Sequence, residues 1–231
     1  MKISGSGKLS EGKINDKLSV SGSARIEGNF ECDGFRSSGS LRGSGDLVVH
    51  GDVRSSGSFR IIGSLFGDGN AKSSGSMSVG GQLSVKGTIV SSGSLKAGNK
   101  VEALEGIRFS GSSRIQGDLL SQKDINVNGS TTIDGNIKGD NVFIGKDQML
   151  HKKVFKQPYK VQGNIYAENQ LDIIGAYVVG DVRGRNVKIG RKTEILGAVY
   201  YIDSIEVHKQ ATLANDPIQI KVDEIEKLIK K

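Results

Sequence analysis

The stretch SGSMSVGGQLSVKGTIVSSGSLKAGNKVEALEGIRFSG, residues 74–111, carries an apolar residue at every sixth position. These positions are Met77, Leu83, Ile89, Leu95, Val101 and Ile107. Most are followed two positions later by a second apolar or small residue, and two positions after that by glycine or another residue common in turns. Residues i and i+2 share one face of a strand, whereas they lie about 200° apart on an α-helix. Each hexad is therefore expected to be a very short strand followed by a bend.

A serine-glycine-serine triplet sets a longer period along the chain. The triplets begin at Ser4, Ser21, Ser38, Ser56, Ser74, Ser92 and Ser110, with Asn128-Gly129-Ser130 as a further variant. A nearly constant step of about 18 residues is typical of a solenoid. The chain has 33 glycines, and glycine suits a bend at every sixth residue because it reaches positive φ without a Cβ clash.

Three hexads in each period predict an all-β fold of stacked triangular coils. This is a parallel β-helix with about 18 residues and three strands in each coil. Residues 4–145 supply about eight coils, and the apolar ladder resumes at Ile165, Leu171 and Tyr177 to add about three more. Coils about 4.8 Å apart would make a rod roughly 50 Å long. We therefore expect one elongated domain over residues 1–216.

Residues 146–160 interrupt the ladder with a mixture of basic and apolar side chains. A solenoid tolerates insertions best at a corner, so we expect a loop there. Such a loop could bind an anionic membrane surface or a partner protein. Its contact residues would be Lys152, Lys153, Phe155, Lys156 and Tyr159. A solvated loop that folds back on the rod is the alternative.

Residues 217–231 have a different pattern from the coils. Pro217 ends the β pattern, and lysines then accompany apolar residues at helical spacing. These apolar residues are Val222, Ile225, Leu228 and Ile229. The pattern predicts a short C-terminal amphipathic α-helix, which we expect to cap the last coil. Contact with a neighbouring molecule or with a bilayer is its alternative role.

The residues that usually carry catalysis are sparse and scattered. The histidines are His50, His151 and His208, and the first and last would be about eight coils, or ~40 Å, apart. The triplets lack the Gly-x-Ser-x-Gly setting of a nucleophile elbow. Cys32, the single cysteine, has an inward register and is expected to be a core residue. We therefore expect a non-enzymatic protein with no metal and no cofactor.

The net charge of +7 and the pI near 9.4 raise nucleic acid as a partner. The basic residues are spread among acidic ones without an aromatic platform, so we expect only weak attraction to polyanions and no specific nucleic acid. The sequence has no apolar run of the length that spans a membrane. One cysteine allows no intramolecular disulfide, which makes a cytoplasmic location the default. Peripheral contact at the inner face of the cell membrane is a further option.

Two segments of the later coils resemble a known family. They are Val161-Gln162-Gly163-Asn164-Ile165-Tyr166-Ala167 and Ile174-Gly175-Ala176-Tyr177-Val178-Val179-Gly180-Asp181-Val182. Similar steps return at Gly117-Asp118-Leu119 and Gly135-Asn136-Ile137. These steps resemble the repeats of the bactofilins, bacterial polymer-forming cytoskeletal proteins. The resemblance extends over nearly all of residues 4–214.

The resemblance to bactofilins implies both a fold and a function. The fold would be a right-handed β-helix, and its molecules would assemble end to end into nonpolar filaments without nucleotide. Such filaments would serve as scaffolds for envelope, shape or motility machinery. The partner would be a second copy of the chain or a related subunit, and contact with a membrane surface or an envelope protein is a further expectation.

End-to-end assembly is also expected from the fold itself. An uncovered terminal coil presents unpaired N–H and C=O groups and the open end of an apolar core, which together form a template for another chain. The expected contact residues are Ile3, Leu9, Ile14 and Leu18 at the N-terminal end, and Ile205, Val207 and Leu213 at the other end. Growth into a filament needs both ends, because a single sticky end stops at a dimer.

Two other functions fit the same sequence. Hexapeptide-repeat β-helices include acyltransferases whose active sites lie between subunits, and discrete trimers would indicate such an enzyme. A non-polymerising adaptor could instead bind partners through its basic loop and its helix. Electron microscopy without nucleotide separates both from a filament-forming protein.

Overall fold

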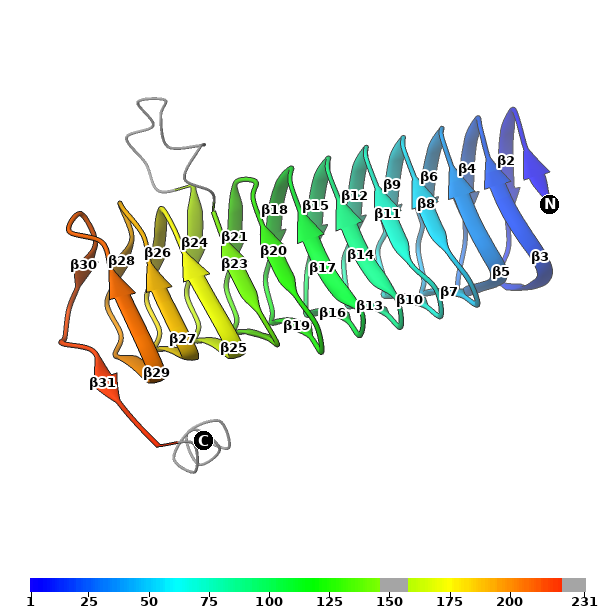
Figure 1. Cartoon of the computed structure of the whole chain (residues 1–231). Helices are drawn as coiled ribbons and strands as arrows, with labels where there is room; N and C mark the ends of the chain where they lie inside the picture. The colour runs from blue at the N-terminus through cyan, green and yellow to red at the C-terminus, as the bar shows by residue number, and fades with distance from the viewer. Residues whose placement is uncertain (146–157, 222–231) are drawn as a thin grey trace.

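The computed structural model describes residues 1–145 and 158–221, and all of its strands belong to one parallel β-solenoid (Figure 1). About 11 coils stack into a rod, with the first coil at one end and strand β30 at the other. Most coils return to the same face after one period of the sequence, as from Leu9 to Ile26 and from Met77 to Leu95. The predicted all-β solenoid of three-strand coils is confirmed.

Three flat faces of the rod meet at three corners. Face 1 is a 12-stranded sheet, and each turn of the chain adds one short strand to it. Its strands are β2 (Ser6–Leu9), β4 (Ser23–Ile26), β6 (Ser40–Gly43), β9 (Ser58–Ile61), β12 (Ser76–Val79), β15 (Ser94–Ala97), β18 (Ser112–Ile115), β21 (Thr131–Ile133), β24 (Tyr159–Val161), β26 (Ala176–Val178), β28 (Glu194–Ile195) and β30 (Thr212–Leu213).

Faces 2 and 3 together form a 19-stranded sheet. The short strands of face 2 are β7 (Leu47–Val49), β10 (Leu65–Gly67), β13 (Leu83–Val85), β16 (Val101–Ala103), β19 (Leu119–Ser121), β22 (Ile137–Gly139) and β31 (Ile218–Gln219). The short strands of face 3 are β1 (Lys2–Ile3), β8 (Val53–Ser55), β11 (Ala71–Ser73), β14 (Thr88–Ser91), β17 (Gly106–Phe109), β20 (Ile125–Val127) and β23 (Val142–Ile144).

Five longer strands run along face 2 and continue round the corner onto face 3. They are β3 (Gly12–Val20), β5 (Phe30–Ser37), β25 (Ile165–Ile173), β27 (Val182–Ile189) and β29 (Val199–Val207). This continuity joins the two faces into one sheet.

The core is a narrow column of side chains inside the rod. The six hexad residues from Met77 to Ile107 are all at most 2% exposed. The parallel register places each over a similar residue of the next coil, and the pairs are Met77 with Leu95, Leu83 with Val101, and Ile89 with Ile107. Burial of one such side chain stabilises a fold by about 1.5–3 kcal/mol. The hexad ladder therefore supplies the continuous core that the sequence predicts.

The corner between faces 3 and 1 carries the triplets, and there the coils come closest. A Cβ placed on Gly75 would lie 2.1 Å from the carbonyl oxygen of Gly57 in the coil before it. The same contact, at 1.7–2.1 Å, recurs at the middle glycine of every triplet from Gly22 to Gly129. The Gly57 oxygen also accepts a hydrogen bond from the backbone N–H of Ser76 at 3.0 Å. Glycine is thus required because two backbones approach without room for a side chain.

The expectation that glycine serves positive φ in these bends is wrong for the triplets. Five of the 33 glycines have positive φ, and none of them is the middle residue of a triplet. They are Gly12, Gly28, Gly106, Gly145 and Gly175. The triplet glycines are needed for close approach of the coils instead of for an unusual backbone conformation.

The corner between faces 1 and 2 is held from coil to coil by polar side chains. There a side-chain oxygen accepts the backbone N–H of a residue one coil later, as Asp46 Oδ1 accepts the N–H of Ser64 at 2.7 Å. The same contact joins Asn29 to Asp46, Ser64 to Gln82, Asp118 to Asn136, Asn136 to Asn164, Asn164 to Asp181 and Asp181 to Ala198. These bonds satisfy N–H groups at the bends and fix the register of successive coils.

Face 3 carries a column of polar side chains inside the rod. Ser37, Ser55, Ser73 and Ser91 follow one another in register and are at most 5% exposed. Within the described part of the chain, the Oγ atoms of the last three have no hydrogen-bond partner. The Oγ of Ser37 differs, because it donates to the Gly39 carbonyl at 3.4 Å. A buried hydroxyl without a partner costs free energy.

The predicted C-terminal helix is wrong for residues 217–221. Strand β31, Ile218–Gln219, pairs there with Tyr200 and Tyr201 of β29. The free edge of β29 offers backbone hydrogen bonds directly, whereas the first turn of a helix has to be nucleated at a cost. The rest of the predicted helix, residues 222–231, lies outside the described residues.

The insertion lies at the triplet corner in chain order, but its predicted range of 146–160 is too long because Tyr159 and Lys160 belong to β24. It separates β23 on face 3 from β24 on face 1. The solenoid resumes at Pro158, whose carbonyl accepts the backbone N–H of Thr131 at 2.9 Å. Residues 146–157 lie outside the described residues. Between residues 1 and 145 and between 158 and 221, no helix is long and apolar enough to cross a membrane.

Replacing Gly75 by alanine is expected to destabilise the protein by roughly 2–3 kcal/mol, because the new Cβ would force two backbones apart. Gly5→Ala is the matched control, since a Cβ on Gly5 would meet nothing within 4 Å. Both changes restrict the unfolded chain equally. Urea unfolding measures the difference, and equal stabilities of the two variants would contradict the close-approach explanation.

Ser73→Ala is expected to raise the free energy of unfolding by about 1 kcal/mol, because it removes a buried hydroxyl that has no partner. Ser37→Ala is the control in the same column, and it should bring no gain because it removes a hydrogen bond. Thermal unfolding compares the two variants. A loss of stability in Ser73→Ala would show that its hydroxyl is satisfied in solution.

Candidate assembly surfaces at the two ends

The N-terminal end of the rod presents free strand edges. Within the described residues, β1 pairs only with β3, and β2 pairs only with β4. The first part of β3, Gly12 to Ile14, pairs with Phe30 to Cys32 of β5. The outer edge of all three segments is therefore unpaired. Unpaired edges of this kind template the addition of another strand.

Three of the predicted N-terminal contact residues lie at this end. Ile3, Leu9 and Ile14 are half-buried and pack against the core from one side only. The prediction that Leu18 is a contact residue is wrong, because its side chain is 0% exposed and lies inside the next coil. The end of the core is thus closed by three apolar side chains that a second apolar surface could cover.

The first triplet, Ser4-Gly5-Ser6, lies at the same end. A Cβ on Gly22 would lie 2.1 Å from the carbonyl oxygen of Gly5, so the side of a triplet glycine that has no room for a Cβ faces the preceding coil. The corresponding point on Gly5 faces the N-terminal end, and apart from Gly5 and its two chain neighbours no atom of the described chain lies within 4 Å of it. The first coil therefore keeps a corner shaped to receive another coil.

The C-terminal end carries the other predicted contact residues. Ile205 and Leu213 are half-buried and pack against the core, and Val207 is 41% exposed. Strand β30 pairs only with β28 among the described residues. Strand β31 covers the edge of β29 on face 2, where Gln219 Nε2 donates to the Ile202 carbonyl at 2.9 Å. Among the residues that the structure describes, faces 1 and 3 of the last coil keep free edges.

Two residues of this end were missed as contact residues. Tyr201 and Ala211 are half-buried and pack against the core beside Ile205 and Leu213. Tyr201 follows Val199 by two positions, which is the hexad spacing of an inward pair. That spacing could have identified it, and Ala211 continues the inward ladder six positions after Ile205, so the same signal could have identified both residues.

The predicted surface of the insertion is only partly placed. Lys152, Lys153, Phe155 and Lys156 lie outside the described residues. The prediction that Tyr159 is a surface contact residue is wrong, because Tyr159 lies in β24, is 3% exposed and belongs to the core. Its Oη donates to the Asn128 carbonyl at 3.1 Å, and burial raises the pKa of the phenol. Its place in the ladder beside Thr131 explains why it faces inward.

A ladder of alternating charges runs along the corner between faces 2 and 3. Its five residues come from successive coils, and they are Lys13, Glu31, His50, Asp68 and Lys86. His50 Nε2 lies 2.5 Å from Glu31 and Nδ1 lies 3.0 Å from Asp68. At the two ends of the ladder, Lys13 contacts Glu31 at 2.5 Å and Lys86 contacts Asp68 at 2.9 Å.

The ladder shifts the pKa values of its members. Hydrogen bonds to Glu31 and then Asp68 raise the pKa of His50. A hydrogen bond from Lys13, followed by that from His50, lowers the pKa of Glu31, and bonds from Lys86 and His50 lower the pKa of Asp68. All of these groups lie at the surface. The protonation state of His50 therefore controls an ionic contact between successive coils.

Metal-binding and nucleophilic groups do not gather in the described part of the chain. No three His, Cys, Asp or Glu side chains converge there on a point that could hold a metal ion. Cys32 is fully buried, as predicted for a core residue. Its burial raises the pKa of the thiol to about 11, which keeps it protonated at neutral pH.

Comparison with family models, with curated protein sequences and with solved structures gave no match.

Stability should depend on pH through His50. Folding raises the pKa of His50. The stability that its ionic contacts contribute is therefore fully present below the usual pKa of 6.5, and it is lost as the pH rises through the pKa of the folded state. The stability contributed by the Glu31 and Asp68 carboxylates, whose pKa values are lowered on folding, is fully present above pH 4.5 and is lost at lower pH. The stability lost in His50→Gln should therefore be larger at about pH 5.5 than at about pH 9. A pH-independent loss, measured by urea unfolding, would contradict this.

Proposed function

We propose that this chain is a bactofilin-like structural protein whose molecules assemble end to end into filaments without nucleotide. In the filament, the first coil of one molecule stacks on a terminal coil of the next at the spacing found inside the rod. The winding is right-handed, as the resemblance implies. The filament serves in the cytoplasm as a scaffold for envelope, shape or motility machinery.

The observation that carries this proposal is the glycine of the first triplet. In the seven later triplets, glycine is required by the coil that lies against it. Gly5 has no such neighbour among the described residues of the molecule. A second molecule stacked on this end would bring a backbone close to Gly5 and would make glycine necessary there as well.

The side chains around Gly5 support the same contact. Ile3, Leu9 and Ile14 close the core while remaining half-buried, so a stacked coil would bury the rest of each. The free edges of β1 and β2 would gain strand partners at the same time. Micromolar association needs about 8 kcal/mol net, and apolar burial together with strand pairing has to exceed the cost of lost translational and rotational freedom.

Both ends of the rod support growth. The last coil offers Ile205 and Leu213 as half-buried apolar residues, and no described strand pairs with its outer edges on faces 1 and 3. A contact that used only one end would stop at a dimer. The N-terminal and C-terminal surfaces therefore act together in a filament, either between identical copies or with a related subunit.

The decisive substitution is Gly5→Ala, which should leave the folded molecule unchanged and weaken assembly. An alanine Cβ has space within the molecule but would meet the backbone of a stacked coil. Circular dichroism and thermal unfolding check the fold, while sedimentation and negative-stain electron microscopy without nucleotide measure assembly. We expect filaments from the unchanged protein and from Ser84→Ala, a control on the side of the rod, and short or no filaments from Gly5→Ala.

Leu9→Asp and Leu213→Asp test the two ends separately. Each should stop growth at small species, because a charge buried between two apolar ends lacks a partner. Normal filaments from Gly5→Ala and Leu9→Asp would show that the N-terminal coil is not a contact surface. Discrete trimers of the unchanged protein would instead indicate a hexapeptide-repeat enzyme, and a lasting monomer would indicate an adaptor.

A further inference from the structure

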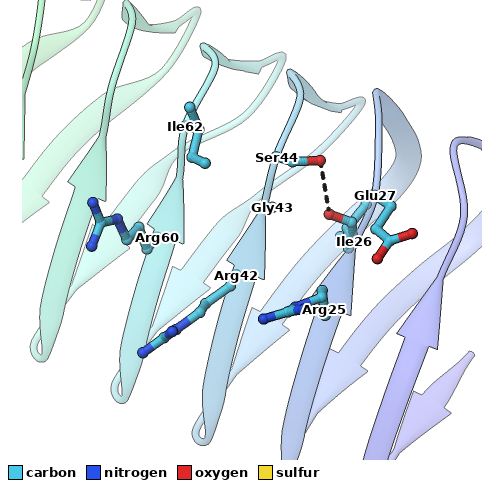
Figure 2. Close-up of a pocket in the computed structure, with 8 residues that line it drawn as sticks. All are labelled: Arg25, Ile26, Glu27, Arg42, Gly43, Ser44, Arg60 and Ile62. Carbon is cyan, nitrogen blue, oxygen red and sulfur yellow. Dashed lines mark hydrogen bonds between the residues drawn. The ribbon is translucent and has the colours of Figure 1, made fainter.

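Three arginines form a row across face 1, away from both ends of the rod. Arg25 on β4, Arg42 on β6 and Arg60 on β9 occupy the same outward position in three successive coils. All three side chains are exposed, and Figure 2 shows them on neighbouring strands. Successive strands lie about 4.8 Å apart, so three positive charges are held in line along the rod axis.

These arginines border a hollow of about 530 Å³. Its lining includes Gly43 and Ser44 on the middle coil, and Ile62 at the corner after β9 (Figure 2). Glu27 lies at one border, and its carboxylate pairs with Lys8 at 2.9 Å. We call this hollow with its three arginines the arginine groove.

The charges of the groove are not balanced within the described residues. No ion pair joins Arg25, Arg42 or Arg60 to a carboxylate in residues 1–145 and 158–221. Some arginines elsewhere on the rod have such a partner, as Arg54 has in Asp52 at 2.9 Å. Like charges on directly adjacent strands repel one another. An anionic ligand would therefore relieve a repulsion that the fold itself creates.

An exposed apolar side chain stands beside these charges. Ile62 is 63% exposed, the highest value among the large apolar residues that are described as exposed. Ser44 precedes it in the corner column and Gly80 follows it, because the N–H groups of Ile62 and Gly80 each bond one coil back at 2.9 Å. Neither neighbour covers the isoleucine. The groove thus combines a row of cations with one apolar contact.

The spacing of the row selects the form of the ligand. In an extended peptide lying along the row, side chains on one side repeat every ~6.7 Å, which falls out of step with strands ~4.8 Å apart. In an α-helix, carboxylates at positions i, i+3 and i+7 lie ~4.5 and ~10.5 Å along the axis from the first. These values match one and two strand steps, ~4.8 and ~9.6 Å, to within about 1 Å.

We infer that the arginine groove binds an acidic amphipathic α-helix of a partner protein, laid along the rod axis. Carboxylates at i, i+3 and i+7 pair with Arg25, Arg42 and Arg60, and an apolar residue on the adjoining side packs on Ile62. This is the helix-in-groove mode of recognition with charged anchors. The groove lies on the side of the rod, so it would remain open in an end-to-end filament.

Binding is tested with a labelled 16-residue helical peptide that carries Glu at i, i+3 and i+7 and Leu at i+4. Fluorescence anisotropy at low and physiological salt measures its affinity. Arg42→Ser should weaken binding about fivefold, because one exposed charge pair contributes up to ~1 kcal/mol. The triple variant Arg25→Ser, Arg42→Ser and Arg60→Ser should weaken it by more than about tenfold. Ile62→Ser should weaken it about threefold.

The controls separate this site from general attraction to a basic protein. Ser78 occupies the same column as the three arginines, so serine is compatible with the fold there. Arg108→Ser removes an equal charge on face 3, where its in-register neighbours are Val90 and Asn126, and it should leave binding unchanged. Gly5→Ala should also leave binding unchanged, which separates this inference from the proposed assembly.

Three results would overturn the inference. A scrambled peptide of equal charge that binds as tightly would show that spacing is not recognised. A peptide with a central proline that binds as tightly would show that the helix is not needed. Vesicles containing anionic phospholipid that bind in an Arg42-dependent way, while the peptide does not, would assign the groove to a lipid surface.

Discussion

The whole structure depends on how closely one coil can lie against the next at the triplet corner. There, from Gly22 to Gly129, the backbone of one coil lies directly against the carbonyl of the coil before it, and a Cβ would come within 1.7–2.1 Å of that oxygen. The strand spacing of about 4.8 Å on the three faces requires the corners to close to the same extent. Glycine at the corner therefore allows the ladders of all three faces, and the aliphatic column inside them, to remain in register.

This constraint separates the roles of the ends and the sides of the rod. At the ends, each coil has lost one neighbour, and the free edges and half-buried apolar residues are those of an interrupted stack. On the sides, every coil contributes one outward position to a straight column, so residues one period apart in sequence become neighbours. Columns of like residues follow from the repeat, and they include the buried serines, the corner side chains with their hydrogen bonds, and the arginines of face 1.

Much of the fold could be predicted from the sequence because one short period controls it. The hexad ladder identified the core from Met77 to Ile107, and Ser-Gly-Ser spacing identified the coil length. The physical role of the glycines could not be predicted, since close approach of backbones and positive φ both demand glycine. The hexad count predicts that Tyr177 faces inward, but it faces outward between the buried residues Ala176 and Val178. The coil from Tyr159 to Ala176 is shorter by one position than the coil from Met77 to Leu95, and this difference shifts the hexad count.

The candidate surfaces were predictable to the extent that they continue the repeat. Ile3, Leu9 and Ile14 follow the inward pattern into the first coil, whereas Leu18 follows it into the second coil and is covered. Residues 217–221 depart from the repeat in sequence, so their strand pairing with β29 could not be read from periodicity. The arginine row needs the register of β4, β6 and β9 before three separate residues become one site.

Cryo-electron microscopy of the assembled protein tests the stacking of coils between molecules most directly. The density should show strand layers at a constant spacing of about 4.8 Å that pass through each junction between molecules without a break. Rods joined side by side, or ends separated by a gap wider than one layer, would contradict the account.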